Sequence, residues 1–397
     1  MGNSYLEWLQ HPDWRVAAYA SAMGMWWISR VLLFPMLLSG LLVRATIVFA
    51  RRYDVLARPS ERGSHTIPTP RLGGLGSAAA FYITFFLVSM WAGHYSMEPW
   101  RMVILLGGTW ALLGGALDDF QELPPRWKLL LQIAACGAVP MLGFAPDVLS
   151  LPLAGDVVLS PTAATIVAVL TTLFLMNIFN FMDGMDGLAA TFGIVTAGTL
   201  GLYIIVQVIQ MRLGATSVLP AIFAGHSAIV VGSLIGLLSC NYPGRNLNKK
   251  TFMGDCGSQF YGFVIAVLAL QAGSSDLPKE VRFPWIASLI LFSPFVYDVV
   301  FTLIRRIRRG ENLTQAHRTH LYQRLMVAGW SHGRALVFNL GLYVVVAGLA
   351  WAYAWCETKG YAFSRLLIVL LTGGLLAAYT FAVMAVENQA QQAARRD

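Results

Sequence analysis

The stretch Thr162–Leu188, TAATIVAVLTTLFLMNIFNFMDGMDGL, contains the pattern that decides the fold of this chain. Its first part, Thr162–Phe179, is mostly apolar and has about the length that a helix needs to cross a bilayer, roughly 20 residues. Two amides and two carboxylates follow at the end of that run. Polar groups are costly near a bilayer core, so such a cluster is a candidate functional site.

Similar apolar runs recur along all 397 residues, of which 57% are hydrophobic and only 12% charged. Soluble proteins carry roughly 25% charged residues. We find no internal repeat and no low-complexity linker, and predict one all-α, polytopic integral membrane domain, residues 1–397. The eleven predicted spans are Met25–Val48, Gly74–Trp91, Trp100–Leu117, Lys128–Leu142, Thr162–Phe179, Leu188–Ile209, Ala221–Leu238, Ser258–Gly273, Pro284–Ile304, Gly333–Trp355 and Phe363–Val386.

The basic residues orient these spans. Eleven crossings put the termini on opposite sides, and 19 of the 28 Lys and Arg residues fall on the side of the C-terminus. Cytoplasmic loops are enriched in Lys and Arg, so we predict a cytoplasmic C-terminus and an N-terminus outside the cytoplasm. The net charge of +8 reflects this distribution and does not indicate nucleic-acid binding.

Five polar clusters all fall on the predicted cytoplasmic side, which indicates a single active-site face. The loops that would form it are 49–73, 118–128, 177–188, 239–258 and 305–334. Four scattered cysteines form no metal-binding spacing, and we expect them to be core residues without disulfides.

Asp118 and Asp119 form an adjacent carboxylate pair at the end of the third span. Acidic residues at a helix C-terminus oppose the helix dipole, which favours a function over a simple solvated helix end. Lys128 begins the next span and could fold back over the pair. Carboxylates beside a cation suit metal-dependent phosphate chemistry or proton transfer.

Asn177, Asn180, Asp183 and Asp186 recur at every third position, which predicts one helical face of oxygen ligands. Such ligands suit Mg²⁺ and a nucleotide, although a polar seam between helices would also explain them. In Gly254–Ser258, GDCGS, backbone N–H groups at a helix start could bind phosphate, with Asp255 holding the cation that neutralises it.

The loop 305–334 begins with an arginine run that we interpret as an anchor to anionic lipid. Beyond it, His317, Arg318 and His320 are candidates for phosphate contact, since no further ligand completes a zinc site. His65 is either a site residue or part of a solvated loop. We expect His226, inside an apolar span, to pack between helices.

With these motifs in place, the chain resembles the polyprenyl-phosphate N-acetylhexosamine-1-phosphate transferase family, glycosyltransferase family 4. The family patterns PRxGG, DDxxxL, NxxNxxDGxDGLA and FMGDxGS are present as Pro70–Gly74, Asp118–Leu123, Asn177–Ala189 and Phe252–Ser258. The resemblance extends over about 58–324 and implies an enzyme of the bacterial inner membrane that uses a UDP-N-acetylhexosamine and undecaprenyl phosphate. Dimers are common in the family, so the resemblance also points to a homodimer.

Residue by residue, the resemblance implies that Asn180 and Asp255 hold Mg²⁺, or alternatively Mn²⁺. The catalytic carboxylates Asp118 and Asp119 would lie beside the lipid phosphate, and Arg318 would clamp the diphosphate. The remaining residues implied to bind substrate are Lys128, Asn177, Asp183, Asp186, His317, His320, His65 and Arg71.

The chain reads His317-Arg318-Thr319-His320 where the peptidoglycan enzyme of the family has three consecutive histidines. This departure argues against a muramoyl-pentapeptide substrate and favours the branch that starts O-antigen-like surface polysaccharides. The reaction would be attack of the lipid phosphate on the β-phosphorus, with release of UMP. Direct attack is expected, and an aspartyl-phosphate route is the alternative.

Two other classes of protein remain as alternatives. A secondary transporter would have many spans, but its binding groups should lie near the middle of the bilayer. A catalytically inactive scaffold of the same fold would have no need of an intact set of Asp118, Asp119, Asn180 and Asp255.

Overall fold

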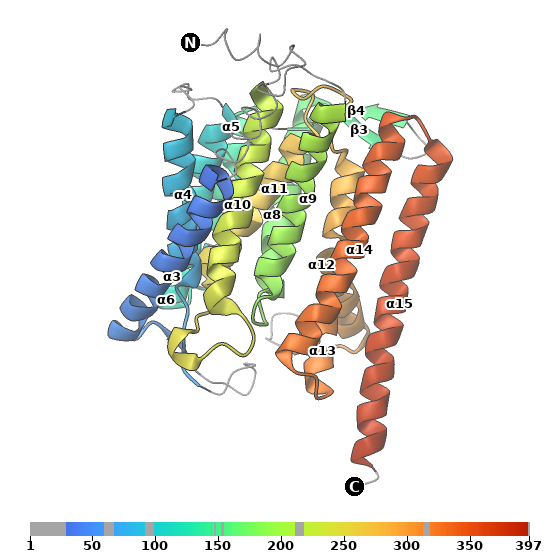
Figure 1. Ribbon diagram of the computed structural model, residues 1–397. Helices are drawn as coiled ribbons and strands as arrows, with labels where there is room; N and C mark the ends of the chain where they lie inside the picture. Colours follow the sequence, from blue (N-terminus) through green and yellow to red (C-terminus); the bar gives the residue numbers. More distant parts are fainter. Residues whose placement is uncertain are drawn as a thin grey trace, which may run out of the picture.

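The computed structural model describes residues 29–58, 67–91, 99–143, 145–146, 148–151, 155–210, 218–312 and 318–395, and these form a bundle of helices (Figure 1). A π-helical turn, η1 (Ser29–Leu33), leads into the first long helix. The helices are α3 (Phe34–Arg52), α4 (Gly73–Trp91), α5 (Pro99–Met102), η2 (Val103–Gly107), α6 (Gly108–Gln121), α7 (Pro125–Met141), α8 (Pro161–Met182), α9 (Leu188–Gln210), α10 (Val218–Asn241), η3 (Leu247–Lys249), α11 (Gly254–Ala272), α12 (Trp285–Arg308), α13 (Leu321–Val327), α14 (His332–Thr358) and α15 (Ala362–Ala394).

In their described parts, the eleven predicted spans fall on helices of the bundle, but only nine helices within the described ranges are long and apolar enough to cross a membrane. The two others are α7 and α11. Helix α7 has 17 residues, and α11 has 19 residues that begin with the polar sequence GDCGSQ. The chain is thus a multi-pass, all-α membrane protein, while the count of eleven crossings stays a prediction.

Helix α11 forms the centre of the bundle. Every residue from Cys256 to Ala272 is buried, and α4, α6, α8 and α9 pack around it. A helix that is buried on all sides needs no polar face and no lipid-facing stripe. Its position explains how it can begin with the sequence GDCGSQ, since protein surrounds it instead of lipid.

Two short antiparallel hairpins complete the fold. Strands β1 (Leu56–Ala57) and β2 (Thr69–Pro70) pair between α3 and α4. Strands β3 (Val148–Leu151) and β4 (Gly155–Val158) pair at the opposite end of the bundle. The first hairpin lies at the lower end in Figure 1, which we call the active-site end because the described parts of the five polar clusters lie there.

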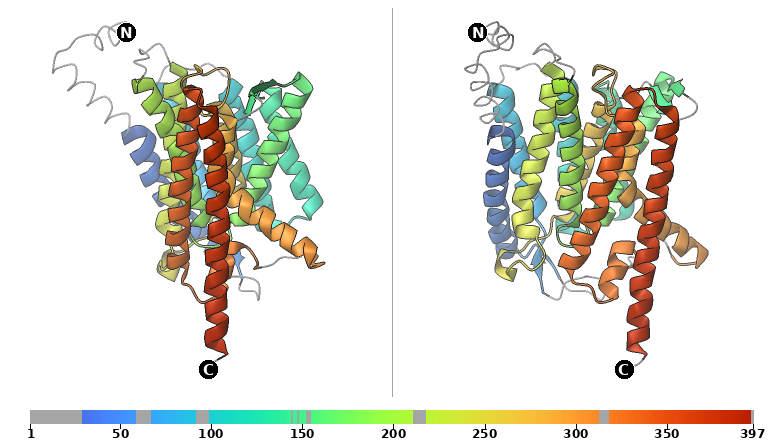
Figure 2. Two further views of the ribbon diagram at one scale, coloured as in Figure 1. Left: turned by 90° about the vertical axis from the view of Figure 1, so that its right-hand side faces the viewer. Right: turned by 45° about the vertical axis from the view of Figure 1, so that its right-hand side comes forward.

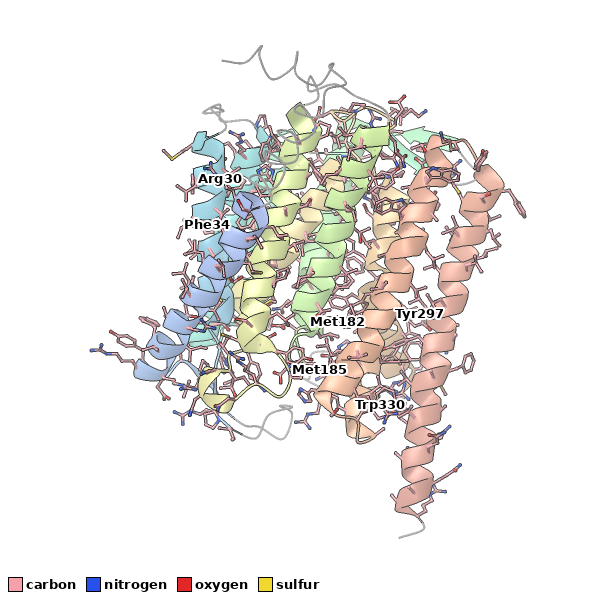
Figure 3. The ribbon with its side chains drawn as sticks, in the orientation of Figure 1. Arg30, Phe34, Met182, Met185, Tyr297 and Trp330 are labelled. Carbon is pink, nitrogen blue, oxygen red and sulfur yellow. The ribbon has the colours of Figure 1, made fainter. Side chains whose placement is uncertain are left out.

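The described chain begins and ends at opposite ends of the bundle (Figures 1 and 2). Helix α3 starts at the upper end, where Arg30 and Phe34 lie (Figure 3), so Arg30 sits at a helix end and not in the middle of a span. Helix α15, 33 residues long, ends beyond the other helices at the active-site end. The side of the membrane that each end faces remains a prediction.

Other expectations for single residues are confirmed. His226 on α10 is 4% exposed and lies between the rings of Phe85 and Trp100, at centroid distances of 5.1 and 4.4 Å. The four cysteines are buried and free of disulfides.

Small residues let the outer helices approach closely. Gly232 and Gly236 on α10 face the backbone of η1 and α3, where an added Cβ would lie 2.3 Å from Leu32 O and 2.4 Å from Met36 O, respectively. Beside this contact, the hydroxyls of Ser39 on α3 and Ser77 on α4 both donate to the carbonyl of Ser233 on α10. Glycine spacing of this kind, with interhelical hydrogen bonds, stabilises helix pairs in membranes.

We therefore expect Gly236→Ala to destabilise the protein by roughly 1–3 kcal/mol, the usual cost of overpacking. The control is Gly341→Ala on α14, where an added Cβ meets no atom within 4 Å and alanine favours the helix. Thermal melting in detergent would measure both variants. Equal melting temperatures for the two would contradict the close α3–α10 contact.

Candidate active site

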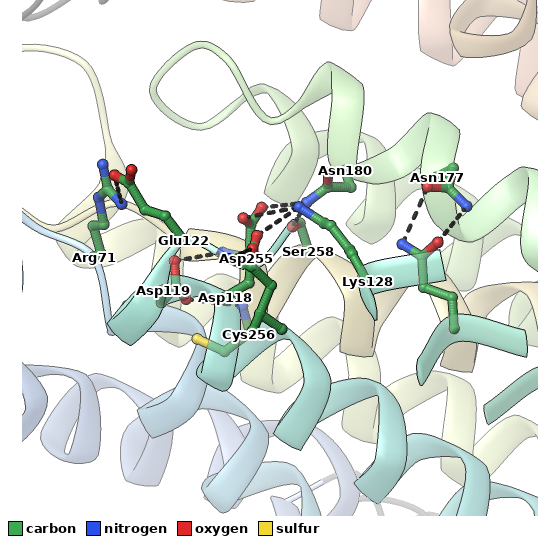
Figure 4. Close-up of polar contacts among 12 residues, drawn as sticks. Arg71, Asp118, Asp119, Glu122, Lys128, Asn177, Asn180, Asp255, Cys256 and Ser258 are labelled. Atoms are coloured by element: carbon green, nitrogen blue, oxygen red, sulfur yellow. Dashed lines mark hydrogen bonds and ion pairs between the residues drawn. The ribbon is translucent and has the colours of Figure 1, made fainter. Parts of the chain in front are cut away.

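Asp119 joins the end of α6 to the start of α11. Its two carboxylate oxygens accept hydrogen bonds from the backbone N–H groups of Asp255, at 3.0 Å, and Cys256, at 2.9 Å (Figure 4). These N–H groups belong to the first turn of α11 and have no partner within the helix. The expectation that this turn offers its N–H groups to phosphate is therefore wrong for these two groups, because Asp119 already accepts from them.

The PRLGG segment packs against the same turn. The Gly73 and Gly74 N–H groups donate to the carbonyls of Phe252 and Met253, and Phe252 N–H donates back to Pro70 O. An added Cβ at Gly74 would lie 2.2 Å from the Cα of Gly257. The PRLGG motif and the FMGDCGS motif are thus in direct backbone contact, and only glycine at position 74 leaves room for it.

Lys128 lies between two carboxylates. Its Nζ is 2.6 Å from Asp118 Oδ2 and 3.1 Å from Asp255 Oδ2, as the dashed lines of Figure 4 show. The expectation that Lys128 folds back over the pair is confirmed for Asp118. Asp118 also accepts a hydrogen bond from the N–H of Leu123 at 2.9 Å.

The predicted face of four polar residues does not exist as one face, because α8 ends at Met182. Asn180 donates to Asp255 Oδ1 and to Ser258 Oγ, the latter at 2.7 Å. Asn177, one turn earlier, exchanges two hydrogen bonds of 3.1 Å with Gln132 on α7. Only Asn180 therefore reaches the carboxylates, while Asn177 joins α7 to α8.

The loop after α8 carries the other two members of that pattern. Asp186 is 4% exposed and pairs with Lys250 Nζ at 2.6 Å and with His332 Nδ1 at 3.3 Å. Burial acts to raise the pKa of Asp186, but these two partners outweigh it and the pKa is lowered. Gly187 has a φ of +75°, which glycine adopts without strain, and its N–H donates to Asn241.

Asp183 has no hydrogen-bond or ion-pair partner for its side chain among the described residues. Burial and the nearby carboxylates of Asp255, Asp119 and Asp186 raise the pKa of Asp183 above its usual range. The carboxylates gathered here, Asp118, Asp119, Asp183, Asp186 and Asp255, therefore outnumber Lys128 and Lys250, the two lysines that pair with members of the group.

A divalent cation fits this excess of carboxylates. No three His, Cys, Asp or Glu side chains of the described ranges converge on one metal position. Asp255 and Asn180, however, are in direct side-chain contact, with the Asn180 amide nitrogen on Asp255 Oδ1, and each side chain also carries an oxygen that could bind a cation. Mg²⁺ in phosphate-binding sites is usually held by one or two carboxylates, with water and substrate oxygens as its other ligands, so a two-residue set suits Mg²⁺ better than a full protein cage would.

Two open grooves meet at Arg71, which faces Glu122 at 3.9 Å. The first, of about 520 Å³, is lined by the charged residues Asp118, Lys128 and Asp255 together with apolar ones that include Leu129 and Phe181. The second, of about 720 Å³, is mostly polar and includes Arg58, Asp119 and Glu122. The first groove therefore presents charge and exposed apolar surface together.

The loop before α13 is only partly described. His317, like His65, lies outside the described residues. Arg318 is exposed. His320 is buried, and its Nδ1 lies 3.0 Å from Asp298 Oδ1 on α12, so it faces a protein carboxylate that the sequence analysis did not identify.

Further residues of the site escaped sequence reasoning: Gln132, Asn241, Lys250 and His332. Gln132 and Asn241 occur in apolar helices, and an amide in such a position is a signal that could have identified them. The partner of Lys250, by contrast, lies 64 residues away in sequence, and no local pattern predicts such a pair.

The chain is similar to known proteins over most of its length. The profile of "Glycosyl transferase family 4" matches residues 101–273. The decaprenyl-phosphate N-acetylglucosaminephosphotransferase of Mycobacterium leprae is 30% identical over 319 residues, which cover 76% of this chain and 78% of the relative. The enzyme of the same name from Mycobacterium tuberculosis H37Rv is 29% identical over 320 residues, 76% and 77% of the two chains.

A third relative is the undecaprenyl-phosphate alpha-N-acetylglucosaminyl 1-phosphate transferase of Escherichia coli K12. It is 27% identical over 297 residues, which cover 72% of this chain and 73% of the relative. Since the matches extend over most of each chain, this protein belongs to the glycosyl transferase family 4 of polyprenyl-phosphate hexosamine-1-phosphate transferases.

Proposed function

We propose that this protein transfers N-acetylhexosamine-1-phosphate from a UDP-sugar to undecaprenyl phosphate, with release of UMP. The relatives act, by their names, on decaprenyl or undecaprenyl phosphate and on N-acetylglucosamine, which makes UDP-N-acetylglucosamine the first donor to test. The product would initiate a cell-surface polysaccharide of the O-antigen type. The active-site end would face the cytoplasm, where UDP-sugars are made.

The observation that supports this proposal most is Lys128 placed between Asp118 and Asp255 in a groove with an apolar wall. A polyprenyl phosphate carries a dianionic head on a hydrocarbon tail, so it needs a cation beside lipid-accessible apolar surface. Phe181 and Leu129, 53% and 46% exposed, supply that surface next to Lys128. A soluble substrate would not require it.

We assign the other residues to the nucleotide sugar. Asn180 and Asp255 would hold Mg²⁺, which when bound neutralises the diphosphate. The loop Asp183–Asp186, braced by Lys250 and His332, would form part of the uridine pocket together with Asn177. Arg71, Arg318 and the three histidines His65, His317 and His320 would surround the phosphates.

The reaction forms a bond between an oxygen of the lipid phosphate and the β-phosphorus and breaks the bond from that phosphorus to the bridging oxygen of UMP. Phosphoryl transfer requires mainly positioning and charge neutralisation. A phosphate monoester is largely dianionic at neutral pH, since its second pKa is about 6. Asp118 would therefore orient the lipid phosphate through Lys128, and Asp119 would fix the helix that carries Asp255.

The direct test measures UMP release by the purified protein in detergent with undecaprenyl phosphate, Mg²⁺ and a panel of UDP-N-acetylhexosamines. We expect UMP only when lipid and Mg²⁺ are both present, and a fall of at least about 100-fold in Asp255→Ala, as for loss of a group that stabilises transition-state charge. A folded protein that releases no UMP with any donor would favour the scaffold alternative.

The two adjacent carboxylates should respond differently to amidation. Asp119→Asn leaves one buried N–H of α11 facing an amide donor, which costs about 1–3 kcal/mol, so the melting temperature and the activity should both fall. Asp118→Asn removes only the pairing with Lys128 and should lower activity with little change in melting. Near-normal turnover of Asp118→Asn at pH 8 would contradict an essential role for that carboxylate.

Lys128→Gln should raise the KM for undecaprenyl phosphate about 10-fold, which corresponds to the loss of one charge-assisted contact of about 1.4 kcal/mol. Lys128→Arg should retain part of the affinity because it retains the charge. Arg126→Gln is the control, since Arg126 is exposed on the same helix and does not line the groove. An equal effect of Arg126→Gln would indicate a general loss of surface charge instead.

A further inference from the structure

Asp298 is a buried carboxylate in the membrane-spanning helix α12. It is 1% exposed, and no Lys or Arg of the described chain pairs with it. An isolated charge in such a place would cost several kcal/mol, and ionisable groups within membrane spans are functional candidates by default. The partners of Asp298 therefore indicate what it does.

Four donors surround the Asp298 carboxylate. Thr302 Oγ1 lies at 3.2 Å on the same helix. The other three come from the start of α13: His320 Nδ1 at 3.0 Å, Leu321 N–H at 2.9 Å and Tyr322 N–H at 3.3 Å. Asp298 thus caps α13 from another helix and fixes the imidazole of His320, whose Nε2 consequently points away from the carboxylate.

The start of α13 packs on the active-site loop. The Tyr322 hydroxyl lies so close to Gly184 that an added Cβ there would be 2.2 Å from it. Gly184 directly follows Asp183, and the rings of His320 and Tyr322 stack with a centroid distance of 5.9 Å. Any shift of the first turn of α13 would therefore move the loop that carries Asp183 and Asp186.

The far end of α13 is fixed as well. Arg324 makes a two-pronged ion pair with Glu387, in the last part of α15. Asp298 holds the first turn of α13 and Glu387 holds Arg324 near its other end, so both ends of this short helix are fixed at the active-site end of the bundle. Arg318 precedes its first turn by only a few residues.

We propose that Asp298 is a positioning residue for the transfer reaction. Through His320 and the capped first turn of α13 it holds Arg318 and the 183–187 loop in one arrangement around the nucleotide diphosphate. This inference rests on the proposed function, because the substrate it serves is the UDP-sugar. Asp298 itself touches no substrate.

The test compares Asp298→Asn with Asp298→Glu in the UMP-release assay. Asparagine has no charge and can offer only one accepting oxygen, so kcat/KM for the UDP-sugar should fall about 10- to 100-fold, as for other groups that orient a ligand-contacting histidine. The KM for undecaprenyl phosphate should change less than threefold. Asp298→Glu, which keeps the charge, should recover part of the loss.

Two further variants separate positioning from plain stability. Tyr343→Phe removes a buried hydroxyl without a hydrogen-bond partner in the described structure, on a helix that packs against α12, and should leave the kinetics unchanged. In a His320→Gln background, Asp298→Asn should have a smaller effect than in the wild type, because part of its effect passes through His320 and coupled pairs are not additive.

The outcomes are distinguishable. Wild-type protein that releases no UMP would contradict the proposed function itself. If wild type is active, full activity in Asp298→Asn would overturn the positioning role. A loss of activity that affects the kinetics of both substrates equally and parallels a fall in melting temperature would also overturn it. Effects of Asp298→Asn and His320→Gln that simply add in the double variant would overturn it as well.

Discussion

The carboxylate of Asp119 accepts two backbone N–H groups from the first turn of α11, and the geometry of the active-site end depends on this pairing. A helix that begins inside a membrane protein must have its free N–H groups satisfied by protein, since lipid offers no acceptors. By meeting that requirement from α6, Asp119 brings Asp118 next to Asp255. Lys128 and Asn180 both lie within hydrogen-bond distance of Asp255. The site is therefore a consequence of how one helix start is capped.

The sequence predicted the helices well because the apolar composition of each outer helix reflects its contact with lipid. An apolar run of about 20 residues has few alternatives to a membrane-spanning helix, and the predicted spans fall on helices of the bundle. Helix α11 follows a different rule, since it is surrounded by protein and its composition reflects its neighbours. The grouping of the polar clusters at one end was also predictable, because the alternation of spans fixes the end at which each loop lies.

The pairings within the site were less predictable. The pairing of Lys128 with Asp118 joins residues only ten positions apart. It follows from the short turn that connects α6 to α7. The pairing of Lys250 with Asp186, and that of Asp298 with the start of α13, depend on where distant helices come to lie. The three-residue spacing of Asn177, Asn180, Asp183 and Asp186 suggested a continuous helix, but the glycines at 184 and 187 end it. Those glycines allow the loop to turn toward Asn241 and Tyr322.

The central place of α11 has a consequence for how the protein is made. A segment that starts with six mostly polar residues and contains an aspartate is a poor substrate for insertion into lipid on its own. The four helices that make most of the contacts with α11, namely α4, α6, α8 and α9, all precede it in the chain. These helices can therefore be in the membrane, with protein surface ready to contact α11, before α11 emerges from the ribosome. The protein can keep a helix with a polar start at its core because most of the helices that shield it from lipid are translated first.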